Sequence, residues 1–122
     1  MGIKRSAILD VLCILPAKRL VNIEVQKDHR NDDLRRTRFH ASLITTHYTD
    51  KNALFSEVPN VTVIYISEYD ALKTNCPVSR ITKDTIDDTG AVRKLNNGEE
   101  ILFATSAICD NSKKIPVAAK NG

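Results

Sequence analysis

Two apolar runs near the start of the chain are separated by a short polar connection. The first run, Ser6 to Leu15, is interrupted only by Asp10, and the second, Leu20 to Gln26, contains three polar residues. Between them lies the sequence Pro-Ala-Lys-Arg, in which proline favours a turn. Two apolar runs with so short a link predict an antiparallel hairpin centred on Ala17.

This centring fixes which side chains share a face of the hairpin. Asp10 would lie directly across from Glu24, and strand alternation would place Gln26 on the same face. A slip of one residue would exchange the two faces. The register is favoured because the opposite face would then be an unbroken apolar core face, made of Leu9, Val11, Cys13, Val21, Ile23 and Val25.

A helix is predicted after the hairpin. Asp32 or Asp33 can cap its N-terminus, and the pattern ends near Tyr48. Its apolar residues recur at roughly helical spacing: Leu34, Phe39, Ala41, Leu43 and Ile44.

Three further strands are predicted. Val61 to Ser67 is β-branched and aromatic with little polarity on either side, which is typical of a central strand buried on both faces and compatible with a parallel neighbour. Val78 to Thr85 and Glu100 to Ser106 are weaker, and glycine-containing turns at 88–90 and 96–98 lie between them. Residues 49–60 read as a loop with a helical turn at 52–56, and 112–122 carries no core pattern.

Length and composition indicate one small domain, and the predicted strands and helix make it α/β. The chain has 122 residues, of which 42% are hydrophobic and 27% charged, which fits a single domain over 1–122 with a loose tail at 110–122. No apolar run reaches the roughly 20 residues that span a bilayer. Three widely spaced cysteines form no zinc or disulfide pattern. A cytoplasmic protein without membrane contact is expected.

The opposed carboxylates are the first candidate site. Asp10 and Glu24 at this distance repel each other unless a proton or a cation lies between them, and a divalent metal is the simplest explanation. The alternative is an ordinary solvated sheet face that carries an aspartate and a glutamate.

Basic residues follow the second strand. Arg35, Arg38 and Ser42 have helical i, i+3, i+7 spacing, so they form one stripe that could hold phosphates beside the carboxylates. Acidic residues at 28, 32 and 33 partly neutralise the segment, and a solvated surface is the alternative reading. The net charge of +3 names no partner by itself.

Ordered motifs from about Ser6 to Ala107 resemble one family. They are Leu-Asp-Val, then Asn-Ile-Glu-Val-Gln-Lys, then a basic helix with Arg38 and Ser42, then Phe-Ser-Glu-Val-Pro-Asn-Val-Thr-Val-Ile-Tyr-Ile. This order is similar to the PD-(D/E)XK nuclease family transposases, which are related to the recombination-promoting nucleases. Val25 stands for that family's methionine, residues 39–40 for its tyrosine pair and Phe55 for a later tyrosine.

The resemblance implies a restriction-endonuclease-like core, a mixed sheet with flanking helices, and metal-dependent cleavage of DNA. Asp10 and Glu24 would bind Mg²⁺ or Mn²⁺ together with the backbone carbonyl of Val25. Gln26, in the position of the superfamily's lysine, would orient the attacking water without carrying charge. The catalytic residues would thus be Asp10, Glu24 and Gln26, and the DNA-binding residues Lys27, Arg30, Arg35, Arg38 and Ser42.

Two alternatives stay open. The family has a helical segment before its Asp-Val strand, to which only Met1 to Arg5 could correspond, so the chain could be an inactive, truncated remnant that binds DNA or self-associates as a homodimer. It could also be a small β-rich nucleic-acid-binding module in which both carboxylates are incidental.

Overall fold

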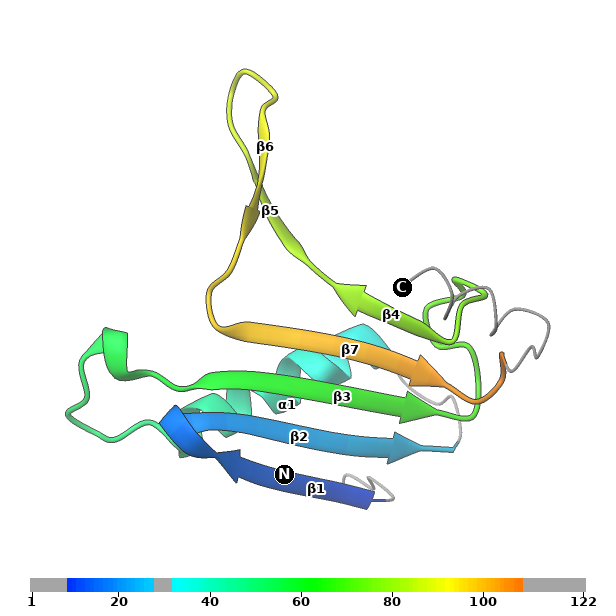
Figure 1. Ribbon diagram of the computed structural model, residues 1–122, viewed down its shortest axis with the longest axis horizontal. Helices are drawn as coiled ribbons and strands as arrows, with labels where there is room; N and C mark the ends of the chain where they lie inside the picture. The colour runs from blue at the N-terminus through cyan, green and yellow to red at the C-terminus, as the bar shows by residue number, and fades with distance from the viewer. Residues whose placement is uncertain (1–8, 28–31, 109–122) are drawn as a thin grey trace.

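A computed structural model describes residues 9–27 and 32–108, without the side chains of Leu9 and Asp10. The elements are β1 (Leu9–Leu15), η1 (Pro16–Lys18), β2 (Arg19–Gln26), α1 (Asp33–His47), η2 (Phe55–Glu57), β3 (Asn60–Ser67), β4 (Val78–Ile81), β5 (Lys83–Ile86), β6 (Val92–Leu95) and β7 (Glu99–Thr105) (Figure 1).

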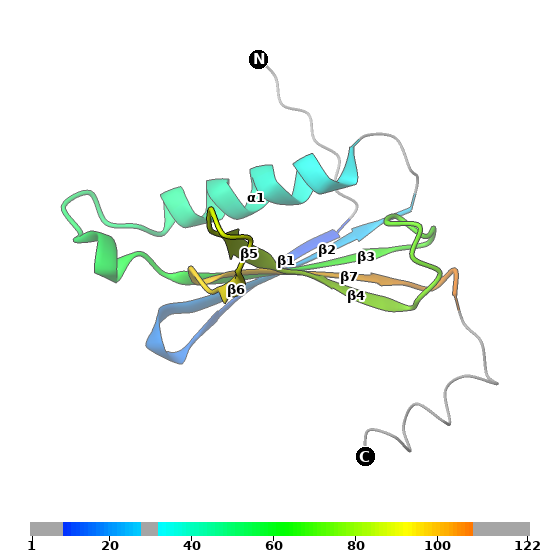
Figure 2. The ribbon, with the colours of Figure 1, turned by 90° about the horizontal axis from the view of Figure 1, so that it is seen from above.

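Five of these strands form one sheet in the order β1-β2-β3-β7-β4. The three inner strands, β2, β3 and β7, are parallel, and each edge strand is antiparallel to its neighbour. The predicted α/β class with a mixed sheet is therefore confirmed. In the described part of the chain α1 is the one α-helix, and it lies on a single face of the sheet (Figure 2).

The first hairpin has the predicted register. Asp10 pairs with Glu24, and Val11 pairs with Ile23. The connection is a single 3-10 turn in which Ala17 and Lys18 have positive φ angles of 64° and 56°. The hairpin therefore closes about Ala17, as its apolar pattern indicates.

Helix α1 begins and ends where its sequence predicts. Asp32 is the N-cap, and its Oδ1 accepts a hydrogen bond of 3.1 Å from the backbone N–H of Arg35. The residues that α1 buries are mostly polar: Asp33, Thr37, His40 and Ala41. Three apolar positions of the predicted pattern, Leu34, Phe39 and Leu43, are instead exposed by about half.

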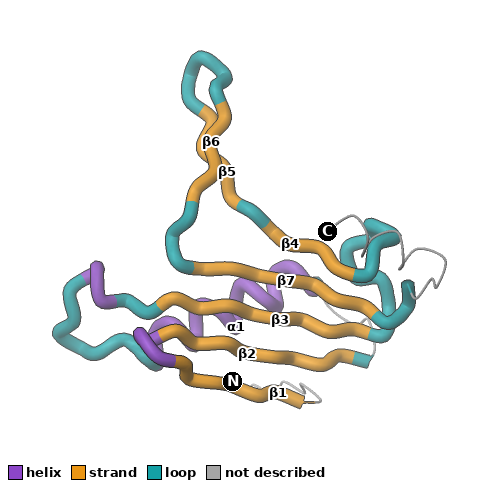
Figure 3. The backbone as a smooth tube through the Cα atoms, viewed as in Figure 1, coloured by secondary structure: helices purple, strands orange, loops and turns teal. Residues whose placement is uncertain are grey.

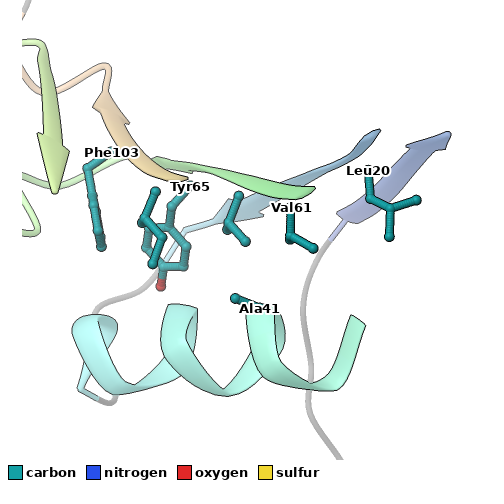
Figure 4. Packing of buried hydrophobic residues seen from close by; sticks show 7 residues of the cluster. Leu20, Ala41, Val61, Tyr65 and Phe103 are labelled. Carbon is teal, nitrogen blue, oxygen red and sulfur yellow. The ribbon is translucent and has the colours of Figure 1, made fainter. Parts of the chain in front are cut away.

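The hydrophobic core lies between α1 and the three inner strands. It consists of Leu20, Ala41, Val61, Val63, Tyr65, Ile101 and Phe103. Figure 4 shows the strand residues extending from the sheet toward the helix, on which Ala41 lies. The rings of Tyr65 and Phe103 are 5.0 Å apart between centroids. Both aromatic residues are almost fully buried.

The apolar face of the hairpin is not the core face, and this corrects the sequence interpretation. On β2 the residues Leu20, Asn22, Glu24 and Gln26 are buried, and the alternate valines and isoleucine are only half-buried. The reason is that α1 packs on the face that carries Glu24. For the same reason β3 is buried on one face only, although its sequence predicts burial on both.

The second half of the chain departs further from its sequence pattern. The strand expected at Val78 to Thr85 is divided: β4 joins the sheet, and β5 leaves it to pair with β6. This β5–β6 pair, here called the arm, projects beyond the β4 edge (Figures 1 and 3). Strand β6 was not predicted, because all four of its residues are exposed and two are charged.

Both glycine turns are present. Gly90 and Gly98 have φ angles of 91° and 90°, which a residue with a Cβ adopts only with strain. The expected helical turn lies slightly later than predicted, at Phe55–Glu57. The expected tail at 110–122 lies outside the described residues. Among the helices described, none has the length and apolar character needed to cross a membrane.

Candidate functional site

Glu24 lies at the centre of a buried polar cluster between β2 and α1. Its exposed fraction is 1%, although glutamate is rarely buried without a partner. It owes this position to strand alternation, which places it on the face that α1 covers. Asn22 and Gln26 flank it on the same strand face and are also buried.

Three side chains surround the carboxylate of Glu24. His40 on α1 contacts Oε2 through Nδ1, and the amide of Asn22 donates to the same oxygen over 3.3 Å. The Nε atom of Arg36 is 3.9 Å from the other oxygen, Oε1. The side chains of Glu24 and Arg36 are only 2% and 10% exposed. Residues 36 and 40 are one helical turn apart, so α1 presents both of them to Glu24.

The two oxygens of Glu24 are thus held differently. Oε2 has two close partners, whereas Oε1 accepts no hydrogen bond from the residues that the structure describes. A buried oxygen left in this way is costly unless another group approaches it. Oε1 is therefore the atom of the cluster with free capacity for a ligand.

A second polar group lies beside the first, where β3 ends and α1 begins. Tyr65 and Tyr69 both donate hydrogen bonds to Oδ1 of Asp33, over 2.6 and 2.8 Å. Ser67 and Thr105 donate to the backbone carbonyl of Tyr69 and hold it over the end of the sheet. Asp33 is in the first turn of α1, where a negative charge is favoured by the helix dipole.

Burial and the neighbouring carboxylate keep both tyrosines protonated. Burial is the main cause that raises the pKa of Tyr65 far above its usual value, and the hydrogen bond to Asp33 adds to it. Burial likewise raises the pKa of Tyr69 to about 12. Both hydroxyls are therefore fixed as donors to Asp33 at neutral pH.

The predicted catalytic and metal-binding residues share one part of the sheet. Asp10 is opposite Glu24 in the backbone register, but its side chain lies outside the description. Gln26 is on the face of Glu24 and 9% exposed. The side chain of Val25 points to the other face, so only its backbone could contribute to a site on the Glu24 side.

The predicted phosphate-binding residues lie on the surface. Arg35, Arg38 and Ser42 are all exposed on α1, and Lys27 is exposed after β2. Arg35 makes an ion pair of 2.5 Å with Asp32, which helps to neutralise this end of the stripe. Arg30 falls outside the described residues.

Sequence reasoning missed Arg36 and His40, the helix residues that reach Glu24. A signal for them existed: residues 33, 36, 37 and 40 form a polar stripe at helical spacing, and β2 carries a matching polar stripe. Two polar stripes on neighbouring elements pack against each other more readily than either packs on an apolar surface.

A separate cavity lies away from these residues. It measures about 490 Å³ at the base of the arm and is lined by residues that include Arg19, Arg80, Lys83 and Lys94. Ion pairs engage three of these cations: Arg80 with Glu100, Lys83 with Glu99 and Lys94 with Asp84. None of the predicted site residues lines this cavity.

The chemistry of the Glu24 cluster suits a hard cation only in combination with Asp10. Among the side chains that are described, no three of His, Cys, Asp and Glu gather as metal ligands. Glu24 supplies a carboxylate oxygen that accepts no hydrogen bond from a described residue, and Asp10 lies opposite Glu24 in the backbone register. Carboxylate oxygens are the ligands that Mg²⁺ and Mn²⁺ prefer.

Comparison with known proteins does not assign the chain. No family model matches the sequence, and neither a curated protein nor a solved structure matches it. A function therefore has to be argued from the residues of the chain itself.

Proposed function

We propose that the chain is a metal-dependent DNA endonuclease with a restriction-endonuclease-like core, as the resemblance to the PD-(D/E)XK nuclease family transposases implies. The observation that carries the proposal is the pairing of Asp10 with Glu24 across β1 and β2, with Gln26 on the same face as Glu24. It is supported by the free oxygen of Glu24, which is buried and accepts no hydrogen bond from a described residue.

In this proposal each residue has a distinct task. Asp10 and Oε1 of Glu24 hold Mg²⁺ or Mn²⁺ together with the backbone carbonyl of Val25. The bound ion would polarise the phosphodiester and lower the pKa of a coordinated water. Gln26 orients the water by hydrogen bonding, since a neutral amide cannot remove its proton.

The helix residues around Glu24 orient it. His40 and Asn22 both hold Oε2, so Oε1 would be the oxygen of Glu24 available to a bound cation. Arg36 is the nearest described cation to Oε1 and can stabilise the carboxylate when no metal is bound. This arrangement supplies charged and polar partners for a glutamate that is almost fully buried.

The DNA backbone would lie along the exposed stripe of α1. Arg35, Arg38 and Ser42 face solvent, and Lys27 lies at the end of the strand that carries Glu24 and Gln26. Basic and hydroxyl side chains of this kind contact phosphates and position DNA without reading its sequence.

A plasmid-nicking assay with Mg²⁺ or Mn²⁺ tests the proposal. Wild type should nick supercoiled DNA, and Asp10→Asn and Glu24→Gln should each reduce the rate by at least about a hundredfold, because each removes a ligand charge at nearly constant volume. Asp88→Asn on the arm is the matched control and should keep wild-type activity. Equal activity of all four proteins, or none in any of them, would reject the nuclease.

A second candidate function is DNA binding without cleavage. It is favoured by a specific observation, since α1 covers Glu24 almost completely while the basic stripe is exposed. In that case the four proteins should bind DNA equally and none should nick it, with or without the metals.

A further inference from the structure

The sheet has one face that no described helix or strand covers. It is the face opposite α1 (Figure 2), and we call it the uncovered face. Leu15, Arg19 and Asn60 lie at one end of this face. Its other residues are Val11, Cys13, Val21, Ile23, Val25, Thr62, Ile64, Ile66, Val78, Arg80, Glu100, Leu102 and Ala104. Most are half-buried by their neighbours, and Val11 and Val78 are 41% and 61% exposed.

The strand registers align these other residues in three rows across the sheet. The central row is almost wholly apolar: Val11, Ile23, Ile64 and Leu102, ending at Arg80. The row nearer the ends of β2 and β3 is Val25, Ile66, Ala104 and Val78, and the third is Cys13, Val21, Thr62 and Glu100. In the first two rows apolar side chains therefore run without interruption over the inner strands, and in the third row Thr62 and Glu100 are polar.

The central part of the uncovered face carries no charge. Toward the β4 edge Arg80 and Glu100 pair with each other over 3.6 Å, and Arg19 lies at one end of the face, beside the cavity at the base of the arm. A neutral, apolar surface does not attract nucleic acid or a strongly charged protein. Its complement is another neutral, apolar surface.

The dimensions of the face favour a sheet as the occupant. Five strands at about 4.8 Å and three rows at about 6.6 Å span roughly 24 by 20 Å. A helix is about 10 to 12 Å wide and would cover only half of this width. A second sheet of the same width covers all three rows at the roughly 10 Å spacing of packed sheets.

We propose that the uncovered face binds the same face of a second copy of this chain, so that two copies form a symmetric two-sheet sandwich. The same patch is used on both copies, as in most two-fold homodimers. The contact would bury roughly 500 Å² of flat face per copy and so about 1,000 Å² in total, the lower limit for a specific interface. The proposal does not depend on nuclease activity.

Analytical ultracentrifugation over a range of protein concentrations tests the proposal. Wild type should pass from monomer to dimer, and Ile64→Lys in the central row should raise the dissociation constant at least about tenfold, because it buries a charge between two apolar sheets. Ile86→Lys is the matched control, since Ile86 is 71% exposed on the arm and outside the face, and it should leave the dissociation constant unchanged. Val78→Lys adds a variant at an exposed corner that leaves the core intact and should weaken the dimer by about threefold.

Alkylation of cysteine gives a readout that needs no substitution. Cys13 lies on the uncovered face and Cys76 is exposed elsewhere. As protein concentration rises, Cys13 should react more slowly with iodoacetamide while Cys76 reacts at a constant rate. The proposal is overturned if wild type stays monomeric at high concentration. It is also overturned if wild type dimerises and neither Ile64→Lys nor Val78→Lys changes the dissociation constant. A monomer that sediments with phosphatidylcholine vesicles also overturns it, since the face would then bind lipid.

Discussion

The two faces of the central sheet differ in polarity, and the more polar face is the more deeply buried one. The face under α1 contains a glutamate, an asparagine, a glutamine and a tyrosine, all nearly inaccessible. The opposite face is mostly aliphatic, with its polar residues toward one end, and is only half-buried. In most sheets with a single covering layer the aliphatic face is the one that is covered.

This contrast separates two contributions to the stability of the chain. Burial of apolar area contributes roughly 25 cal/mol per Å² and does not require specific contacts. Buried polar groups stabilise the fold only when each one has its hydrogen-bond partner. The covered face therefore depends on a few specific contacts around Glu24 and Asp33. The apolar side chains of the uncovered face can be removed from water, and so add to stability, only by packing against another surface.

The largest effect is expected from removing a partner of Glu24. His40→Ala should lower the free energy of unfolding by about 3 to 5 kcal/mol, because it leaves a buried carboxylate short of a partner. The triple change Glu24→Leu, Arg36→Met and His40→Leu should recover most of that loss, since no unpaired charge remains. Urea denaturation measures both. A triple variant less stable than His40→Ala would show that the cluster itself stabilises the fold.

Neighbouring residues of β3 compare the two faces directly. Val63 is fully buried on the covered face, and Ile64 is half-buried on the other. Val63→Ala should cost about 2 to 3 kcal/mol, and Ile64→Ala less than about 1 kcal/mol in the monomer, although it removes more carbon atoms. Urea denaturation at low protein concentration tests this. If the two faces pair in a dimer, the cost of Ile64→Ala should grow with protein concentration.

The buried, hydrogen-bonded Tyr65 and Tyr69 should make the stability of the fold decrease at alkaline pH. In the unfolded chain tyrosines ionise near pH 10, whereas in the folded chain the pKa of Tyr69 is about 12 and that of Tyr65 is also raised. Between these values the folded state binds more protons, so the free energy of unfolding falls as pH rises. Tyr65→Phe should cost about 2 kcal/mol at pH 7 and reduce the slope above pH 10. Exposed Tyr48 offers the control Tyr48→Phe, for which both values should match wild type.

The smallest effect on stability is expected on the outer surface of α1. The double change Arg35→Gln and Arg38→Gln should alter the free energy of unfolding by less than about 0.5 kcal/mol, because both side chains are exposed. It should weaken DNA binding for all sequences and reduce the salt slope by about one unit per lost phosphate contact. Fluorescence anisotropy at several salt concentrations measures this. An unchanged slope would place the DNA path away from this stripe.

Local features were predicted from the sequence better than the packing of the helix against the sheet. The register about Ala17, the cap at Asp32 and the turn at Gly98 depend on neighbouring residues, and all three are present. Alternation along β2 separated two faces correctly but could not say which one α1 covers. That choice depends on a match between distant residues, as between His40 and Glu24, which alternation in one strand does not contain.

Two further errors have the same origin. The arm was missed because β6 buries nothing and so has no hydrophobic period to detect. The contact of Arg36 with Glu24 was missed because the predicted basic stripe consists of Arg35, Arg38 and Ser42 and does not include Arg36. Of the candidate site, the opposition of Asp10 and Glu24 was predictable from sequence, and the helix residues that hold Glu24 were not.

The sheet order also constrains how the chain assembles. Strands β1 and β2 form one local hairpin, and β4 to β7 form a longer one in which the arm is the tip, so each can close early with little loss of chain entropy. The parallel seam between β3 and β7 joins these two halves, and its partners Val61 and Glu99 are far apart in sequence. We therefore expect the formation of this seam to limit the folding rate, because β3 acquires its second neighbour only after β7, the last of the described strands, has left the ribosome.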